Sequence, residues 1–267
     1  MSRVHLFELE DQTWFPRVFR DAGTAYLELA NRLGRHSAAL APKLAEALAA
    51  SGEKRIVDLC SGGAGPVAGI VDALALQGVE VHALLTDFYP NAGSLARASA
   101  CSAGRIDWVR EPVDATQVPR ELAGVRTIFS AFHHFRPASA RGILADAAAA
   151  GRPIAIFEIV AREPLALFSM LFVPLVFALS LPFLRPFRWL WLPFTYLLPV
   201  LPLFVLWDGL VSCLRVYSPS ELRRLVDSLE ARHRDAYTWD IGRIRLGVAP
   251  ARATYLVAVP RSAQISS

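Results

Sequence analysis

Short apolar runs alternate with segments of helical periodicity over most of the first 160 residues of the chain. Runs rich in Val, Ile, Leu and Phe predict strands at 53–60, 79–87, 106–110, 126–132 and 153–159. Helices are expected over 13–49 and near 66–78, 91–103 and 137–150. Strands that alternate with helices of this length are typical of parallel βαβ units, so we predict an α/β fold with a doubly wound sheet.

The end of the chain follows a different pattern. A helix is expected over 218–230, because Ser218 or Ser220 can cap its first turn and Glu221 lies within that turn. Two strand-like segments follow at 236–246 and 253–260. The short link between them predicts an antiparallel terminal hairpin at one edge of the sheet.

A long apolar segment lies between these two parts. Residues 164–207 contain only two charged residues, Arg185 and Arg188. The mean hydropathy of the whole chain is +0.35, which is high for a cytosolic enzyme, and the excess lies in this segment. Each half is long enough to span a bilayer, but six internal prolines interrupt the segment. We therefore predict a broken, re-entrant or interfacial hairpin in contact with a membrane. The aromatic residues expected near the lipid headgroups are Trp189, Trp191, Tyr196 and Trp207. The alternative is an apolar lid over the pocket of a soluble enzyme.

Charge and cysteine content exclude several classes of protein. The net charge is +4, but there is no run of five basic residues and no nucleic-acid-binding motif, so no nucleic-acid partner is expected. The three cysteines are widely spaced, which argues against a disulfide framework, a redox pair or a zinc site, and no metal site is predicted. Because the first residues lack the apolar stretch of a secretory signal, the amino terminus is expected to stay cytoplasmic.

Candidate ligand-binding residues follow the predicted strands, where ligands bind in doubly wound sheets. Asp58 and a glycine-rich loop follow the first strand, and the loop lets a ligand approach the backbone closely. Asp87 ends the second strand, where a carboxylate can accept from both hydroxyls of a ribose. Asp114 follows the third strand, where an acid can accept from an adenine amino group. Capping of the next helix is the alternative role of Asp87 and Asp114.

The glycine-rich loop alone does not identify the cofactor. Gly63-x-Gly65-x-x-Ala68 fits the dinucleotide-binding pattern, and Asp87 lies 22 residues beyond Gly65. NAD and another adenosine cofactor therefore both remain open on this loop. Asp58 before the loop, Asp114 at the adenine position and the antiparallel terminal strands favour S-adenosylmethionine.

Four motifs together resemble those of the class I S-adenosylmethionine-dependent methyltransferases: RIVDLCSGGAGP, LTDFYPN, PVDATQVP and IFSAFHHF. The resemblance covers roughly residues 53–160 and, more loosely, 215–260. It implies a Rossmann-like methyltransferase sheet and S-adenosylmethionine as cofactor. Cys60 and Ala64 stand where relatives usually have glycine, and Cys60 is interpreted as a small packing residue. The residues implied around the cofactor are Asp58, Cys60, Ser61, Gly62, Gly63, Gly65, Asp87, Phe88, Asp114, Ala115 and Ser130.

The resemblance and the apolar segment together predict methyl transfer to a hydrophobic small-molecule or lipid-like acceptor at the cytoplasmic face of the membrane. An oxygen acceptor has to lose a proton, and His133 or His134 is the right type of residue to remove it. The alternative role of either histidine is a hydrogen bond to the backbone beneath the pocket. Two other functions compete: an NAD(P)-dependent reductase, and a non-catalytic membrane adaptor whose cofactor fold has degenerated at Cys60 and Ala64.

Four regions follow from these predictions. An N-terminal helical cap is expected first, and its aromatic and acidic residues suggest that it covers the cofactor or acceptor pocket. The S-adenosylmethionine-binding core, the membrane-associated hydrophobic insertion or lid, and a C-terminal helix and strand pair that completes the core follow in that order. Their expected bounds are 1–52, 53–160, 161–214 and 215–267.

Overall fold

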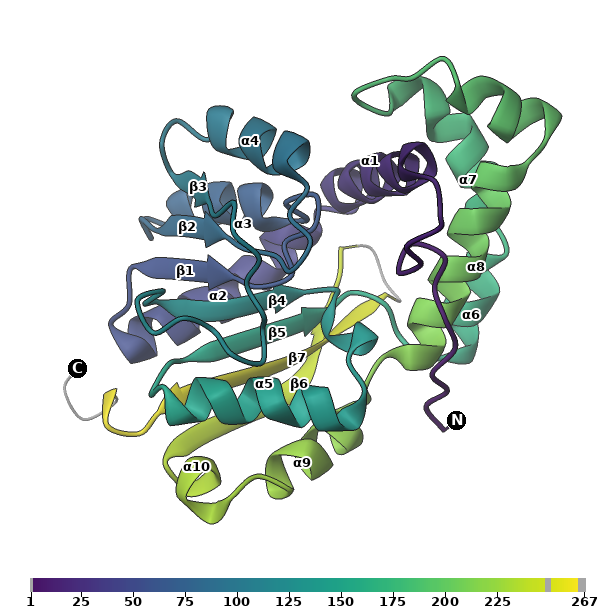
Figure 1. Ribbon diagram of the computed structural model, residues 1–267. Helices are drawn as coiled ribbons and strands as arrows, with labels where there is room; N and C mark the ends of the chain where they lie inside the picture. The colour runs from purple at the N-terminus through teal and green to yellow at the C-terminus, as the bar shows by residue number, and fades with distance from the viewer. Residues whose placement is uncertain (1, 248–250, 264–267) are drawn as a thin grey trace.

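The computed structural model describes residues 2–247 and 251–263. Its centre is a seven-stranded sheet with the strand order β3-β2-β1-β4-β5-β7-β6 (Figure 1). The first five strands are parallel, and β7 runs antiparallel to both of its neighbours, β5 and β6. The strands are β1 (Arg55–Asp58), β2 (His82–Leu85), β3 (Ile106–Trp108), β4 (Val125–Phe129), β5 (Ile154–Glu158), β6 (Tyr237–Arg245) and β7 (Arg252–Pro260). The predicted α/β sheet with an antiparallel terminal pair is confirmed.

Helices cover both faces of the sheet and form one apolar core with each face. Ile56 belongs to the first core and the next residue, Val57, to the second, because successive side chains of a strand point to opposite faces. The first core packs under α2 (His36–Ser51), α3 (Val67–Ala75) and α4 (Ala92–Ala100). The second packs under α5 (Pro137–Ala149) and α9 (Pro219–Asp227), and the short α10 (Ala231–Asp235) follows α9.

The helix ends follow local sequence signals. The predicted helical region 13–49 forms two helices, α1 (Arg17–Leu33) and α2, and Gly34 ends the first of them. Helix α9 begins with a capping box, in which the Ser218 hydroxyl accepts from the backbone N–H of Glu221 and the Glu221 carboxylate accepts from the backbone N–H of Ser218. Of the two residues predicted to cap this helix, Ser218 and Ser220, the structure has Ser218.

The apolar segment forms a helical insertion after β5 that stands beyond the carboxyl ends of β4 and β5 (Figure 1). Its elements are α6 (Pro164–Met170), α7 (Val173–Ser180), the 3-10 turn η2 (Leu181–Phe183), the π-helical turn η3 (Pro193–Leu197) and α8 (Val200–Arg215). Its inner side forms a third core with α1, which includes Ala22, Leu29, Phe177 and Phe204. The N-terminal cap and the insertion, which the sequence treats as separate regions, thus share one core.

Within the described residues, no single helix is long and apolar enough to cross a membrane. Two bent helix pairs have the length and composition to do so, α6 with the stretch Val173–Phe183, and α8 with α9. The prediction that Trp191 lies near lipid headgroups is wrong. Its side chain is fully buried in the third core, and its indole N–H donates to the carbonyl of Val18 at 2.9 Å. Trp189 and Tyr196 are exposed, and Trp207 is partly so.

Candidate active site

The glycine-rich loop after β1 has the backbone of a tight ligand-binding turn. Gly62 and Gly65 have positive φ angles, and so do Cys60 (φ 61°) and Ala64 (φ 78°), where the methyltransferase motif usually has glycine. Because Cys60 and Ala64 have side chains, the left-handed backbone conformation is strained at these two residues. A Cβ atom built on Gly62 or Gly65 would meet no atom within 4 Å, so open space borders the loop at both positions. The two substitutions leave the turn itself intact.

Helix α1 lies directly over this loop. A Cβ atom on Gly63 would stand 2.2 Å from the Thr24 methyl carbon, so only glycine allows this approach. The Glu28 carboxylate comes next, 3.5 Å from the same position, and burial raises the pKa of Glu28. The N-terminal cap therefore covers the predicted cofactor loop, which the sequence only suggested.

Asp58 supports the loop from below. Its side chain is 2% exposed, and its two carboxylate oxygens accept from the hydroxyls of Ser61 at 2.6 Å and Thr127 at 2.7 Å. Burial raises the pKa of Asp58 to about 7, although the two hydrogen bonds oppose the rise. Asp58 thus lies beneath the turn rather than in the open space before it. Its predicted contact with the amino-acid end of the cofactor stays a prediction.

Asp87 joins the glycine-rich loop to the end of β2. One carboxylate oxygen accepts from the backbone N–H of Gly62 at 2.7 Å, and the other accepts from that of Tyr89 at 2.7 Å. The side chain is half-buried, and the neighbouring Phe88 ring is about half exposed. Because each oxygen keeps a free lone pair, the carboxylate can still accept from a pair of ligand hydroxyls.

The remaining predicted cofactor residues lie in two loops along the same edge of the sheet. Asp114 is exposed, and one of its oxygens accepts from both the backbone N–H and the hydroxyl of Thr116. This local turn leaves the second oxygen of Asp114 available. Ala115 is buried in the second core. Ser130, after β4, has a positive φ of 50°, and its N–H donates to the carbonyl of Phe157.

The two predicted catalytic histidines lie on a 3-10 turn, η1 (Phe132–His134), that follows β4. His133 is buried against Glu158, the last residue of β5. The Glu158 carboxylate accepts from the backbone N–H of His133 at 3.0 Å, and its second oxygen lies 2.7 Å from the His133 Nδ1 atom. With the proton of a neutral ring on Nδ1, the His133 Nε2 atom carries the free lone pair. The backbone-bonding alternative does not describe this ring, because its partner is a carboxylate.

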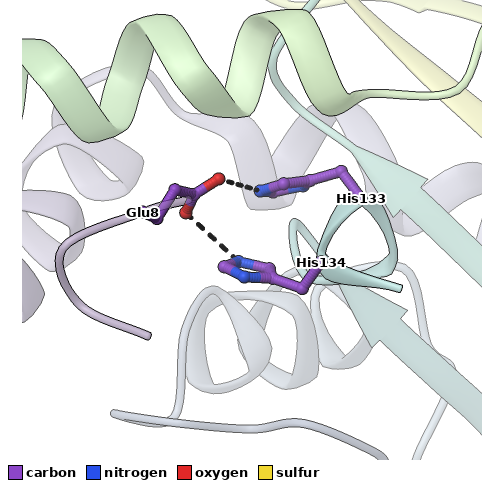
Figure 2. A group of neighbouring side chains, drawn as sticks. All are labelled: Glu8, His133 and His134. Carbon is purple, nitrogen blue, oxygen red and sulfur yellow. Dashed lines mark ion pairs between the residues drawn. The ribbon is translucent and has the colours of Figure 1, made fainter. Parts of the chain in front are cut away.

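His134 faces the N-terminal segment. Its Nδ1 atom lies 2.9 Å from Asp11, and its Nε2 atom lies 3.6 Å from Glu8 (Figure 2). Burial alone would lower the pKa of His134, but the bond to Asp11 and the charge of Glu8 outweigh it and raise this pKa to about 9. His134 is therefore a cation at neutral pH in the absence of a ligand.

Helix α8 holds the N-terminal segment in place. Asp208 accepts from the backbone N–H groups of Leu9 at 2.7 Å and Glu10 at 3.0 Å. Arg215 donates to the carboxylates of Glu8 at 3.0 Å and Asp11 at 2.9 Å. These contacts fix the fully buried Glu8 beside both histidines.

Sequence reasoning missed Glu8, Asp11, Glu158 and Arg215. Glu158 ends a predicted strand at the same edge of the sheet as the histidines, and that position was the available signal. Glu8 and Asp11 precede the first helix and approach the site only through contacts with the distant α8, which no spacing rule shows.

No protein-family model matches the sequence, and no curated protein matches it significantly. Among solved structures, the plantazolicin methyltransferase BpumL in complex with SAH has a TM-score of 0.57 and 11% identity, over 95% of this chain and 95% of that chain. The pyocyanin biosynthetic protein PhzM has a TM-score of 0.51 and 15% identity, over 87% of this chain and 56% of that one.

The mitomycin 7-O-methyltransferase MmcR has a TM-score of 0.47 and 16% identity, over 89% of this chain and 53% of that one. This chain thus spans about half the length of PhzM and MmcR. The match to BpumL extends over nearly the whole of both chains. The protein therefore has the fold of the class I S-adenosylmethionine-dependent methyltransferases.

Proposed function

We propose that this protein is an S-adenosylmethionine-dependent methyltransferase that acts on a hydrophobic acceptor at the cytoplasmic face of a membrane. One observation carries the proposal: an open glycine-rich turn, Asp87 and Asp114 lie along the carboxyl edge of a sheet with the class I methyltransferase fold. The presence of SAH in the structure of BpumL supports the same cofactor here.

The residues along this edge fit that cofactor. Gly62 and Gly65 leave room for a ligand against the backbone, and the half-buried Asp87 can accept from two ribose hydroxyls. Asp114 keeps one oxygen free for an adenine amino group. The cofactor, when bound, supplies an electrophilic methyl group on a sulfonium. This chain contributes mainly binding and orientation, which are large parts of the catalysis of an in-line displacement.

The acceptor's proton passes to the His133 Nε2 atom, which carries a free lone pair, whereas His134 is already protonated beside Glu8. The Nε2 atoms of both imidazoles point toward the Glu8 carboxylate (Figure 2). Glu158 and Asp11 hold the opposite nitrogens. A hydroxyl acceptor reaches His133 past His134, whose side chain is 24% exposed, because His133 and Glu8 are closed off from solvent.

The outer side of the insertion supports a membrane location. Large apolar side chains are exposed along its helices, whereas monomeric soluble proteins rarely expose large contiguous apolar patches. The exposed residues are Leu165, Phe168, Leu171, Phe172, Leu175, Leu179, Phe183, Trp189, Leu190, Leu197, Leu198 and Leu203. Arg185 and Arg188 are exposed within the same segment and suit anionic headgroups. The position of the insertion beyond the carboxyl ends of β4 and β5 supports a lipid-like acceptor.

Calorimetry with S-adenosylmethionine tests the cofactor. We expect the wild type to bind it, and Asp87→Ala to weaken binding by about 100-fold, since two hydrogen bonds to a charged group are lost. Asp107→Ala, which removes a largely exposed carboxylate from β3, is the matched control and should bind normally. A wild type that binds no S-adenosylmethionine refutes the proposal. Enhanced NADPH fluorescence in such a protein would indicate the reductase instead.

Vesicle flotation tests the membrane location. Leu175→Glu combined with Leu179→Glu puts two charges on the exposed side of α7, where the leucines are 60% and 67% exposed. We expect this variant to lose binding to anionic vesicles without a loss of stability. Leu76→Glu, at an 89% exposed position after α3, is the control and should float like the wild type. Transfer of a labelled methyl group to a lipid extract would then identify the acceptor.

A further inference from the structure

Three side chains from distant parts of the chain direct metal-binding atoms toward one another (Figure 2). One ligand atom from each of Glu8, His133 and His134 lies within 4.8 Å of the other two. The Glu8 oxygens stand 3.7 Å from the His133 Nε2 atom and 3.6 Å from the His134 Nε2 atom. These distances are too long for hydrogen bonds. They are close to the separation of about 3.4 Å between two ligand atoms on a tetrahedral cation with bonds of about 2.1 Å.

Two of these atoms are buried without a partner. The His133 Nε2 atom and one Glu8 oxygen accept or donate no hydrogen bond, although the side chains are only 3% and 1% exposed. Buried polar atoms are nearly always hydrogen-bonded, so two unsatisfied atoms in one small cluster indicate a missing ligand. The unsatisfied Glu8 oxygen, Oε2, faces His134, whereas Oε1, which faces His133, accepts from Ser212 and Arg215. A cation between the imidazoles and the carboxylate would satisfy both.

The opposite side of each imidazole has the contact that metal-bound histidines make. The His133 Nδ1 atom lies 2.7 Å from Glu158, and the His134 Nδ1 atom lies 2.9 Å from Asp11. A carboxylate at this position fixes the proton on Nδ1 and directs the Nε2 lone pair at the cation. Both rings therefore have the same orientation toward Glu8.

Negative charge exceeds positive charge around the three groups. The carboxyl groups nearest to the histidines are Glu8, Asp11 and Glu158. Among the residues described in contact with Glu8, Arg215 is the one that is positively charged at every pH near neutral. A bound divalent cation would reduce this excess of negative charge. A protonated imidazole carries a single positive charge and reduces it less.

We propose that Glu8, His133 and His134 bind one divalent transition-metal cation, with zinc the ion that two imidazole nitrogens and one carboxylate oxygen suit best. Three protein ligands leave a coordination position open, as in catalytic zinc sites. The role of the cation rests on the methyl transfer proposed above. The acceptor hydroxyl would take the open position, where the cation would lower the pKa of that hydroxyl. With the three side chains bound to the cation, the proton would leave to water at the exposed side of His134, and the acceptor oxygen would then take the sulfonium methyl group and release S-adenosylhomocysteine.

Metal titrations of the full-length protein test the site. After treatment with a chelator, we expect the wild type to bind one zinc ion per chain in calorimetry, and one cobalt ion with the visible absorption of four- or five-coordinate Co²⁺. Glu8→Gln and His134→Gln remove ligands, so each should weaken binding by more than about tenfold, and Asp11→Asn should weaken it by about tenfold through the orientation of His134. His82→Gln removes a partly exposed histidine that pairs with Asp107, and it should bind zinc like the wild type.

Two results would overturn the metal site: a wild type that binds less than half an equivalent of zinc, or ligand variants that remain folded and bind zinc like the wild type. Circular dichroism establishes which variants are folded, and the wild-type titration decides the question even if the variants are not. The two proposals fail separately. Without a metal site, S-adenosylmethionine binding is unchanged, and without methyltransferase activity, stoichiometric zinc binding remains.

Discussion

Asp58 makes the stability of the protein depend on pH in a direction unusual for a carboxylate. Most carboxylates in folded proteins are stabilised in the charged form, so stability is lost as the pH falls. Asp58 is the reverse case, because burial beneath the glycine-rich loop raises its pKa to about 7. The folded protein therefore holds this proton more tightly than the unfolded chain does, and the free energy of unfolding should fall as the pH rises.

The size of the effect follows from the two pKa values. The unfolded chain releases the proton near the ordinary aspartate pKa of about 3.9, and the folded protein releases it near 7. Linkage between these values predicts that Asp58 lowers the free energy of unfolding by about 2 kcal/mol between pH 5 and pH 7. Above pH 7 the contribution levels off, because the group is then ionised in both states.

Asp58→Asn removes this titration and keeps the hydrogen bonds. The amide oxygen can accept from one of the hydroxyls of Ser61 and Thr127, and the amide nitrogen can donate to the other. Urea unfolding followed by circular dichroism at pH 5 and pH 7 gives the change for each protein. We expect the wild type to lose about 2 kcal/mol more than the variant over this range.

Subtracting one change from the other cancels the titration of every group that the two proteins share. Asp227→Asn, at an exposed position in α9, is the control and should follow the wild type. Equal pH dependence of the wild type and Asp58→Asn would contradict a raised pKa of Asp58 in the folded protein. Such a result would mean that the Asp58 carboxyl reaches water and titrates near its ordinary pKa.

Two further predictions concern the contacts of the cap. Gly63→Ala places a methyl group 2.2 Å from the Thr24 methyl carbon and should lower the free energy of unfolding by about 1–3 kcal/mol, and Thr24→Ala in the same chain should restore part of the loss in urea unfolding. An equal loss in both backgrounds would show that α1 does not lie on the loop. Trp191→Phe removes the hydrogen bond to Val18 and leaves a small cavity, so chemical denaturation should show a loss of about 2–4 kcal/mol. A loss below about 1 kcal/mol would contradict the burial of this indole.

The sheet and its carboxyl edge could be predicted because local patterns encode them. Each parallel strand is a short apolar run, and Asp87 and Asp114 follow such runs directly. The capping box of α9 is equally local, since Ser218 and Glu221 are three residues apart. Features of this kind depend on residues that are close together in the sequence, so a single sequence is enough to predict them.

The surroundings of the histidines could not be predicted in the same way. Glu8 lies 125 residues before His133, and it reaches the site because Asp208 and Arg215 hold the segment around it. The burial of Trp191 depends likewise on a partner that the apolar segment does not show, which is the carbonyl of Val18. Both features depend on tertiary contacts between distant regions of the chain. The local sequence of each region gives no sign of the contact.

The position of α1 between two partners limits how the cofactor can enter and leave. On one side, Thr24 touches the glycine-rich loop, and on the other, a Cβ atom on Gly23 would stand 3.0 Å from the Phe204 ring of α8. An ion pair between Asp21 and Arg188 adds a second connection to the insertion. Lifting α1 away from the loop alone would break the third core. Movement of α1 away from the loop therefore has to take the packed side of the insertion with it or open the third core.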